Sequence, residues 1–387
     1  MIPGYPHLAF HRHWEISPKA RYELGQCHAI IMAICEMPLR PERHDSLLRV
    51  SLIKGAQATT AIEGNTLSTD EIERVAAGDS LPPSKEYQEI EVRNVLEAMN
   101  ALLDEVATEQ RAQRITPELI LRMHEMIGKN LGPHFDAVPG RFRTDHRIVG
   151  SYRCPDHEVV PELVSQLCDW LATEFLFSQG DQPFADAVVQ AIVTHVYVEW
   201  IHPFGDGNGR TGRLLEFYIL LRAGTPDIAS HILANLYNET RPEYYRHLEN
   251  AARTQDLTSF MDYAVQGFRD GLVETLVAIQ SGQFETAWRS FIHDRFAETK
   301  YTKKNVFKRR RELMLTFPAG GALTLDEVAL LTPGVARTYA QLSERTLIRD
   351  LKALEQMGLV ANTEDGFTAQ SDVLRFQRPR RLPIELF

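Results

Sequence analysis

The sequence predicts a mainly α-helical protein with one β-hairpin flap and a C-terminal winged helix-turn-helix domain, and three observations lead to this fold class. Apolar residues recur at helical spacing through most of residues 17–300. Within that region, residues 140–161 (GRFRTDHRIVGSYRCPDHEVVP) are instead rich in glycine, β-branched and aromatic residues, which predicts a short hairpin or extended flap. After residue 300, a basic run and a Pro–Gly turn begin a new helical pattern.

The C-terminal region has the order of elements expected of a winged helix. The basic run KKNVFKRRR is followed by TLDEVALLTPG and then by SERTLIRDLKALEQMGLV. The last of these has Ser343 as its expected N-cap and Gly358 near its end, and a strand-like segment around GFTAQ follows. A capped amphipathic helix followed by strands is typical of a winged helix-turn-helix.

The length of 387 residues is sufficient for two or three domains. We expect a helical N-terminal region over residues 1–110, a central domain over residues 111–300 and the winged helix over residues 301–387. The sequence has no apolar run approaching the 18 residues of a membrane span, no signal-peptide pattern and no CxxC pair among its four cysteines. These features predict a cytoplasmic protein with no membrane partner.

The net charge of −10 is unevenly distributed along the chain. Residues 301–387 carry 14 Lys and Arg against 10 Asp and Glu, whereas residues 1–300 carry 28 against 42. The basic C-terminal region is therefore the better candidate for contact with nucleic acid.

The strongest chemical signal is HPFGDGNGRTGR, residues 202–213, between two apolar helical segments. Its glycines allow backbone N–H groups to turn inward, and the following helix adds the positive end of its dipole, so the loop is suited to bind an anion. Arg210 and Arg213 are three residues apart and lie on one helix face, where both guanidinium groups can bind phosphate oxygens.

Two further residues of this motif suit nucleotide chemistry. Asp206 is a candidate ligand for Mg²⁺, which prefers one or two carboxylates together with substrate phosphates. His202 is a histidine, the residue type whose usual pKa suits it to accept a proton near neutrality. Taken singly, such residues also occur in ordinary glycine-rich connections between helices. Their combination within twelve residues favours phosphoryl or nucleotidyl transfer from a Mg²⁺–nucleotide.

These twelve residues match the Fic signature HxFx(D/E)GNGRxxR at every fixed position. The chain resembles Fic proteins from about residue 44 to residue 270, with GRFRTDHRIVG as the flap and EYYRHLENA as a later helix. The resemblance implies a Fic-type helical bundle. It also implies a protein adenylyltransferase, which transfers AMP from ATP, with Mg²⁺, to a Ser, Thr or Tyr hydroxyl of a target protein or of itself.

The same resemblance implies roles for individual residues. His202 is the expected catalytic base, Phe204 anchors the loop and Asp206 binds Mg²⁺. The flap would dock the target protein through backbone hydrogen bonds. The expected nucleotide-binding residues come from the loop, the flap and a later helix: Gly207, Asn208, Gly209, Arg210, Thr211, Gly212, Arg213, Val149, Gly150, Ser151, Tyr152 and Tyr245.

A second family pattern lies near the N-terminus. Residues 59–64, TTAIEG, match the inhibitory motif (S/T)xxxE(G/N). The resemblance implies that Glu63 pairs with Arg213 and draws this guanidinium away from the γ-phosphate. The alternative is an exposed glutamate at the end of an amphipathic helix, with Gly64 as the residue that ends it.

Two other functions stay open. Glu63 is also able to orient a water that removes AMP from a modified target, as in some relatives. A DNA-binding regulator whose Fic domain senses nucleotide is the other alternative, with Arg345, Arg349 and Lys352 along the C-terminal helix as the phosphate contacts. Winged helices also serve as protein-docking modules or as the interface of a homodimer.

Overall fold

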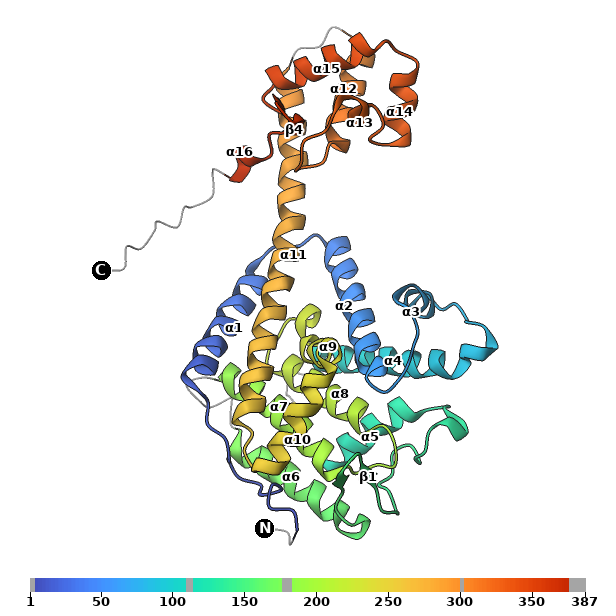
Figure 1. Ribbon diagram of the computed structural model, residues 1–387, viewed down its shortest axis with the longest axis vertical. Coiled ribbons are helices and arrows are strands. Elements are labelled where there is room, and N and C mark those ends of the chain that lie inside the picture. Colours follow the sequence, from blue (N-terminus) through green and yellow to red (C-terminus); the bar gives the residue numbers. More distant parts are fainter. Residues whose placement is uncertain (1–3, 109–113, 176–182, 300–302, 376–387) are drawn as a thin grey trace, which may run out of the picture. The chain divides into compact units, whose positions relative to one another are not determined.

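The computed structural model describes residues 4–108, 114–175, 183–299 and 303–375 (Figure 1). Its α-helices are α1 (Pro18–Glu36), α2 (Pro41–Ala61), α3 (Thr69–Ala76), α4 (Glu86–Thr108), α5 (Pro117–Gly128), α6 (Val160–Glu174), α7 (Pro183–Ile201), α8 (Asn208–Arg222), α9 (Ile232–Glu239), α10 (Arg241–Thr254), α11 (Thr258–Glu298), α12 (Lys304–Thr316), α13 (Leu325–Ala329), α14 (Pro333–Ala340), α15 (Glu344–Gln356) and α16 (Asp372–Arg375). The strands form two antiparallel hairpins, β1 (Ile148–Val149) with β2 (Tyr152–Arg153) and β3 (Val360–Thr363) with β4 (Gly366–Ala369). The predicted mainly α fold and the predicted hairpin in the flap are confirmed.

The chain divides into two compact units, Met1–Val277 and Ala278–Phe387. The division falls inside α11, because Trp288, Ile292 and Phe296 of this helix are buried in the core of the C-terminal unit. The last part of α11, which the sequence suggests belongs to the central domain, therefore packs with the C-terminal unit. The boundaries expected after residues 110 and 300 lie outside the described residues.

α7 is the central helix of the first unit. It packs against α1, α6 and most extensively α8. Within the described residues, Phe184–Ile201 is the one helical stretch long and apolar enough to cross a membrane, and 83% of it is buried inside the protein. A helix that is apolar on all sides is typical of a protein core. The pairing of α7 with α8 fixes the position of the loop between them, which carries the candidate site.

The C-terminal unit contains α12–α15 followed by the β3–β4 hairpin. The hairpin pairs Val360 with Ala369 and Thr363 with Gly366, and Leu323 forms a further antiparallel bridge to Phe367. Helices followed by a hairpin are the order predicted from the sequence. The identification of this unit as a winged helix stays a prediction.

A buried carboxylate organises the C-terminal unit. Asp350 of α15 is fully buried and accepts hydrogen bonds from Arg309 Nε at 2.6 Å, Arg310 Nε at 2.7 Å and the Tyr339 hydroxyl at 3.0 Å. Burial alone would raise the pKa of Asp350, but these donors hold the pKa below its ordinary value. Two arginines of the basic run therefore stabilise the interior of this unit.

Candidate functional site

The loop between α7 and α8 begins with His202, whose backbone lies in the left-handed region (φ 49°). This conformation is strained for a residue other than glycine. Buried Arg143 holds it: Nε donates to the His202 carbonyl at 2.7 Å, and the Arg143 backbone N–H donates to the Pro203 carbonyl at 3.0 Å. The same guanidinium donates to the carbonyls of Asp145 (2.6 Å) and Pro155 (2.5 Å), at the two ends of the flap. Arg143 thus fixes the flap and the His202 backbone together.

His202 is uncharged at neutral pH. Burial of the imidazole, reinforced by the positive charge of Arg143, lowers the pKa of His202 to about 4. The neutral ring is the form that accepts a proton. The negative charge of Glu63 acts on the same ring in the opposite direction. The expected base and the expected inhibitory carboxylate are therefore close in space.

The rest of the loop is held from within. Asn208 accepts a hydrogen bond from the Phe204 N–H and donates one to the Phe204 carbonyl, both at 2.9 Å. The buried Phe204 ring stacks on His124 with ring centroids 3.6 Å apart. Gly207 caps α8 with φ 81°, and a Cβ there would lie 3.0 Å from the Phe135 ring. The side chain of Asn208 is therefore hydrogen-bonded within the loop. Its contact with phosphate stays a prediction, and the backbone amide of Asn208 would make it.

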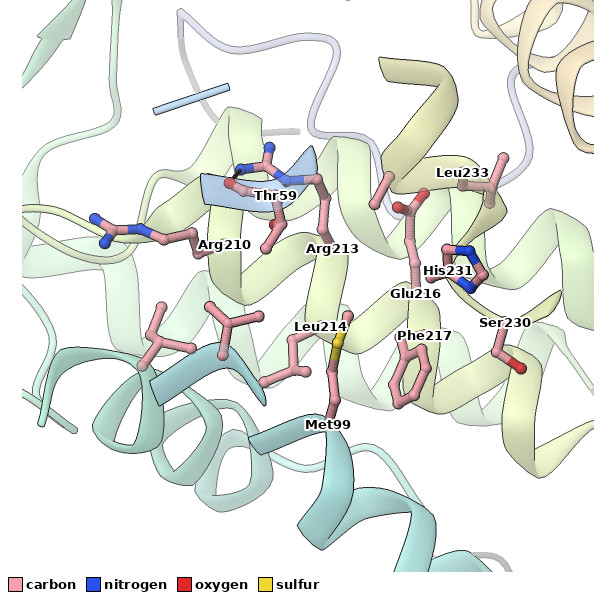
Figure 2. A pocket seen from close by; sticks show the side chains of 13 residues that line it. Thr59, Met99, Arg210, Arg213, Leu214, Glu216, Phe217, Ser230, His231 and Leu233 are labelled. Atoms are coloured by element: carbon pink, nitrogen blue, oxygen red, sulfur yellow. Dashed lines mark hydrogen bonds between the residues drawn. The ribbon is translucent and has the colours of Figure 1, made fainter. Parts of the chain in front are cut away.

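The carboxylate of Glu63 lies at the first turn of α8. Glu63 accepts a hydrogen bond from Arg213 Nη2 at 2.5 Å. Thr59 adds two contacts, since its Oγ1 accepts from Arg213 Nε at 2.7 Å and its carbonyl accepts from Nη2 at 3.0 Å. Figure 2 shows the Arg213 guanidinium beside Thr59. A Cβ on Gly209 would overlap Glu63 Oε1, so the carboxylate lies against the backbone at the helix N-terminus, where an anion is favoured.

The ion pair between Glu63 and Arg213 is charged at neutral pH. Burial alone would raise the pKa of Glu63, but the charge and hydrogen bond of Arg213 outweigh burial and hold the pKa below its ordinary value. Burial likewise disfavours the charged form of Arg213, and Glu63 more than compensates, so the pKa of Arg213 is raised. The structure therefore contains the contact on which the predicted inhibition depends.

Arg210 lies one turn before Arg213 on α8 (Figure 2). It pairs with Glu91 of α4, and its Nη2 donates to Asp206 Oδ1 at 2.7 Å. The Asp206 side chain is 30% exposed, which leaves it accessible to a solvated cation. In the described parts of the chain, no three His, Cys, Asp or Glu side chains are grouped to hold a metal ion. The donors present fit Mg²⁺ if substrate phosphates and water complete its coordination.

Thr211 and Gly212 face the packing between helices. Thr211 Oγ1 donates to the Gly207 carbonyl at 2.8 Å, and a Cβ on Gly212 would lie 2.8 Å from His195 Nδ1 on α7. A glycine at this position permits the close approach of α8 to α7. The contacts of these two residues with nucleotide stay predictions.

The flap residues differ in exposure. Gly150 adopts φ 59° in the two-residue turn with Ser151, as such hairpins require, and Ser151 is exposed. Val149 is also exposed. Tyr152 points inward, because its hydroxyl donates to the Trp200 carbonyl at 2.8 Å. Of the four predicted nucleotide-binding residues in the flap, Tyr152 is thus the one held against α7.

The adjacent tyrosines of α10 also differ. Tyr244 is buried, and its hydroxyl is hydrogen-bonded to His195 Nε2 at 2.9 Å. Tyr245 is 44% exposed, with the Arg241 guanidinium 5.8 Å from its ring centroid. Tyr245 is therefore the one of the two whose ring is accessible to a ligand, and its contact with adenine stays a prediction.

Three residues outside the predicted set also hold the site: Arg143, His124 and Glu91. His124 Nδ1 accepts the Gly140 N–H at 3.1 Å, so its Nε2 carries the proton and donates to the Asp206 carbonyl at 3.0 Å. Burial lowers the pKa of His124 to about 4, which keeps it neutral. His124 therefore links the start of the flap to the backbone of Asp206.

Comparisons with known proteins agree with this geometry. Residues 114–220 match the model of the Fic/DOC family. The chain is 31% identical over 208 residues to protein adenylyltransferase fic-1 of Caenorhabditis elegans, covering 54% of this chain and 38% of that protein. It is 28% identical over 209 residues to protein adenylyltransferase Fic of Nematostella vectensis, covering 54% and 45%. The chain thus spans less than half the length of these relatives.

Solved structures show the same fold. A Fic family protein from Desulfovibrio desulfuricans, 23% identical, matches with a TM-score of 0.57 over 92% of this chain and 94% of that chain. The Fic-1 structure from C. elegans, 26% identical, matches with a TM-score of 0.56 over 68% and 73%. The helix–loop–helix geometry around His202 therefore lies in the part of the chain, residues 114–220, that matches the Fic/DOC family model.

Proposed function

We propose that this chain is a protein adenylyltransferase that moves AMP from ATP to Ser, Thr or Tyr hydroxyls of a target protein and of itself, and that Glu63 inhibits it. One observation carries the proposal. The Glu63 carboxylate lies on Gly209 at the N-terminus of α8 and pairs with Arg213, so an anion of the chain occupies a place suited to a phosphate. The relatives from Caenorhabditis elegans and Nematostella vectensis are named protein adenylyltransferases, which supports the same chemistry.

The proposed reaction exchanges one phosphate ester bond for another. Neutral His202 takes the proton of the acceptor hydroxyl, and the hydroxyl oxygen bonds to the α-phosphorus of ATP. The bond from that phosphorus to the oxygen bridging to the β-phosphate breaks, and pyrophosphate leaves with this oxygen. Arg210 and Arg213 would stabilise the phosphate charge. Asp206 would hold Mg²⁺, which neutralises charge on the phosphates when bound.

The β1 edge of the flap is proposed to dock the target protein. Cys154 donates its backbone N–H to the Arg147 carbonyl at 3.1 Å, so these two residues form a hydrogen-bonded pair. In an antiparallel ladder the next pair, Ile148 with Arg153, then directs its backbone groups outward. The exposed side chain of Ile148 accompanies these groups. An extended target segment adding to this edge would be recognised mainly through its backbone.

Intact-mass spectrometry tests the proposed activity directly. The purified chain is incubated with Mg²⁺ and each of ATP, GTP, CTP and UTP in turn. We expect added mass equal to one adenylyl group, with ATP alone. Transfer of another nucleotide would contradict the assignment to AMP. Release of AMP from a pre-modified chain, without net addition, would assign removal of AMP instead.

We propose a cytoplasmic location for this activity. All four cysteines are free thiols, and Cys27, Cys154 and Cys168 are buried. Unpaired thiols are typical of proteins in reducing compartments. Fractionation of cells that express the tagged chain tests this location. Recovery of the protein with membranes or in the medium would contradict it.

For the C-terminal unit we propose contact with DNA phosphates through α15. Arg345, Arg349 and Lys352 are exposed on this helix, whereas the tip of the β3–β4 hairpin carries exposed Glu364 and Asp365. The acidic hairpin tip would be repelled by phosphate, so α15 is the proposed contact. A homodimer interface or a protein-docking surface is the alternative for this unit.

Gel-shift titrations with a duplex at 50 and 200 mM salt test this contact. Three phosphate contacts predict a loss of affinity of about 40-fold between the two concentrations. Alanine at Arg345, Arg349 and Lys352 together should remove most of this salt dependence, while the control Lys304→Ala and Lys308→Ala on α12 should keep it. Absence of binding at 50 mM salt would contradict the DNA proposal and favour the docking or dimer role.

A further inference from the structure

An N-terminal arm, here residues 4–16, contacts the flap across a long sequence separation. The Tyr5 hydroxyl donates to the Cys154 carbonyl at 2.9 Å. His7 is buried, and its Nε2 lies 3.0 Å from the Tyr152 hydroxyl. The ring of His7 also packs edge-on against Trp200, with centroids 5.0 Å apart. The arm thus contacts the flap at β2 and at the residue that follows it.

The hydrogen-bond direction through this cluster is fixed. Burial raises the pKa of Tyr152 above its ordinary value, so its hydroxyl keeps its proton. That proton is donated to the Trp200 carbonyl at 2.8 Å. The Tyr152 oxygen must then act as the acceptor for His7, and His7 Nε2 carries the hydrogen. The resulting chain of donors runs from His7 to Tyr152 to the α7 backbone, two residues before His202.

The described contacts of the arm with the flap are with β2 and with Cys154, the residue that follows it. β2 and Cys154 are held by the arm and by α7, whereas the side chains of Ile148 and Val149 in β1 are 70% and 47% exposed. Holding β2 keeps the β1 edge open and at a fixed place relative to His202. An edge that is already ordered binds an extended segment at a smaller entropic cost.

We infer that Tyr5 and His7 are positioning residues for target docking: they hold β2 through Cys154 and Tyr152 so that the β1 edge presents the acceptor hydroxyl to His202. This inference deepens the proposed function and rests on it for the docking step. It assigns to the N-terminal arm a part in the affinity for protein substrate rather than for ATP, because the Tyr152 hydroxyl that the arm contacts is already bonded to His7 and to the Trp200 carbonyl.

Amide hydrogen exchange of the full chain tests the hold on β2 without any reaction. His7→Ala removes the donor to Tyr152, and Tyr5→Phe removes the donor to Cys154. Each variant should speed exchange of the amides in residues 147–154 about fivefold to tenfold, with α8 unchanged. His7→Gln keeps a side-chain N–H donor and should restore slow exchange. His11→Ala is the matched control, because His11 is exposed on the same arm. Unchanged exchange in both His7→Ala and Tyr5→Phe would overturn the inference.

Kinetics then separate target docking from nucleotide binding. The acceptor is the full-length His202→Ala chain, and transfer of labelled AMP to it is followed in a Glu63→Gly enzyme. His7→Ala should raise KM for the acceptor about tenfold and leave KM for ATP within about twofold. An equal rise in both constants would contradict a docking role. Absence of transfer with the arm intact would overturn the proposed function instead, and the exchange result would still decide whether the arm holds the hairpin.

Discussion

Replacing His202 with asparagine or alanine is expected to lower the rate of AMP transfer by about 10²- to 10⁴-fold, the usual contribution of a general base. Asparagine is the sharper variant, because it tolerates the left-handed backbone that His202 adopts (φ 49°) but is not a base. The measurement is incorporation of labelled AMP in a Glu63→Gly background, where we expect the basal rate to be highest.

Thermal melting and nucleotide binding are the controls for this prediction. The melting temperature of His202→Asn should stay close to that of the parent, because Arg143 contacts the carbonyl of residue 202 and not its ring. ATP affinity should also be preserved. If His202→Asn kept more than about a tenth of the parent rate, the role of His202 as base would be contradicted.

The pH dependence of transfer follows from the same residue. Burial, with Arg143, lowers the pKa of His202 to about 4, so the ring is already in its accepting form throughout the neutral range. The rate should therefore be level above about pH 5 and should fall as the pH drops through about 4, where the ring takes up a proton. A fall centred near pH 6.5 instead would show that the imidazole is solvated during the reaction.

The local parts of the site could be predicted from the sequence because they follow from short spacings. Twelve consecutive residues carry the candidate base, the glycine turn and both arginines, and a loop between two apolar helices leaves few arrangements for them. The contact of Glu63 with Arg213 was also predictable, although the two residues are 150 positions apart, because the pattern at residues 59–64 points to it.

The supporting residues could not be predicted, since single polar residues in apolar or turn segments give no periodic signal. Arg143 stands in GRFR as one basic residue among several near it, and only the folded chain shows that its guanidinium reaches three carbonyls. His124 in PELILRMHEMIG is equally compatible with helix packing. The basic run before residue 312 gives a clear signal in the sequence, but the structure gives two of its arginines a structural role. Both donate hydrogen bonds to the buried carboxylate of Asp350.

The second large effect is expected from Glu63→Gly, which should raise auto-modification about 10- to 100-fold. Arg213 donates one charge-assisted hydrogen bond to Glu63, and such bonds contribute about 1.5–3 kcal/mol. Removing the carboxylate frees Arg213 and the α8 N-terminus for phosphate, while the two contacts with Thr59 still orient the guanidinium. Glu63→Gln should give an intermediate rise, because it removes the charge and keeps an acceptor oxygen. Glu73→Gly is the matched control, because Glu73 is exposed on α3, and it should leave the rate unchanged.

The pH behaviour of the wild-type chain separates this inhibition from a general loss of activity. Arg213 holds the pKa of Glu63 below its ordinary value, so the carboxylate is charged and the contact intact at neutral pH, and the contact is lost only as the pH falls through that lowered pKa. The ratio of the Glu63→Gly rate to the wild-type rate should therefore be constant from pH 6 to pH 8.

Because the ion pair also stabilises the fold, Glu63→Gly should have a lower melting temperature than wild type without nucleotide. Its melting temperature should rise more with ATP, since phosphate then restores a negative partner to Arg213. Equal rates for the two proteins would show that Glu63 does not compete with phosphate and would remove the inhibition from this account.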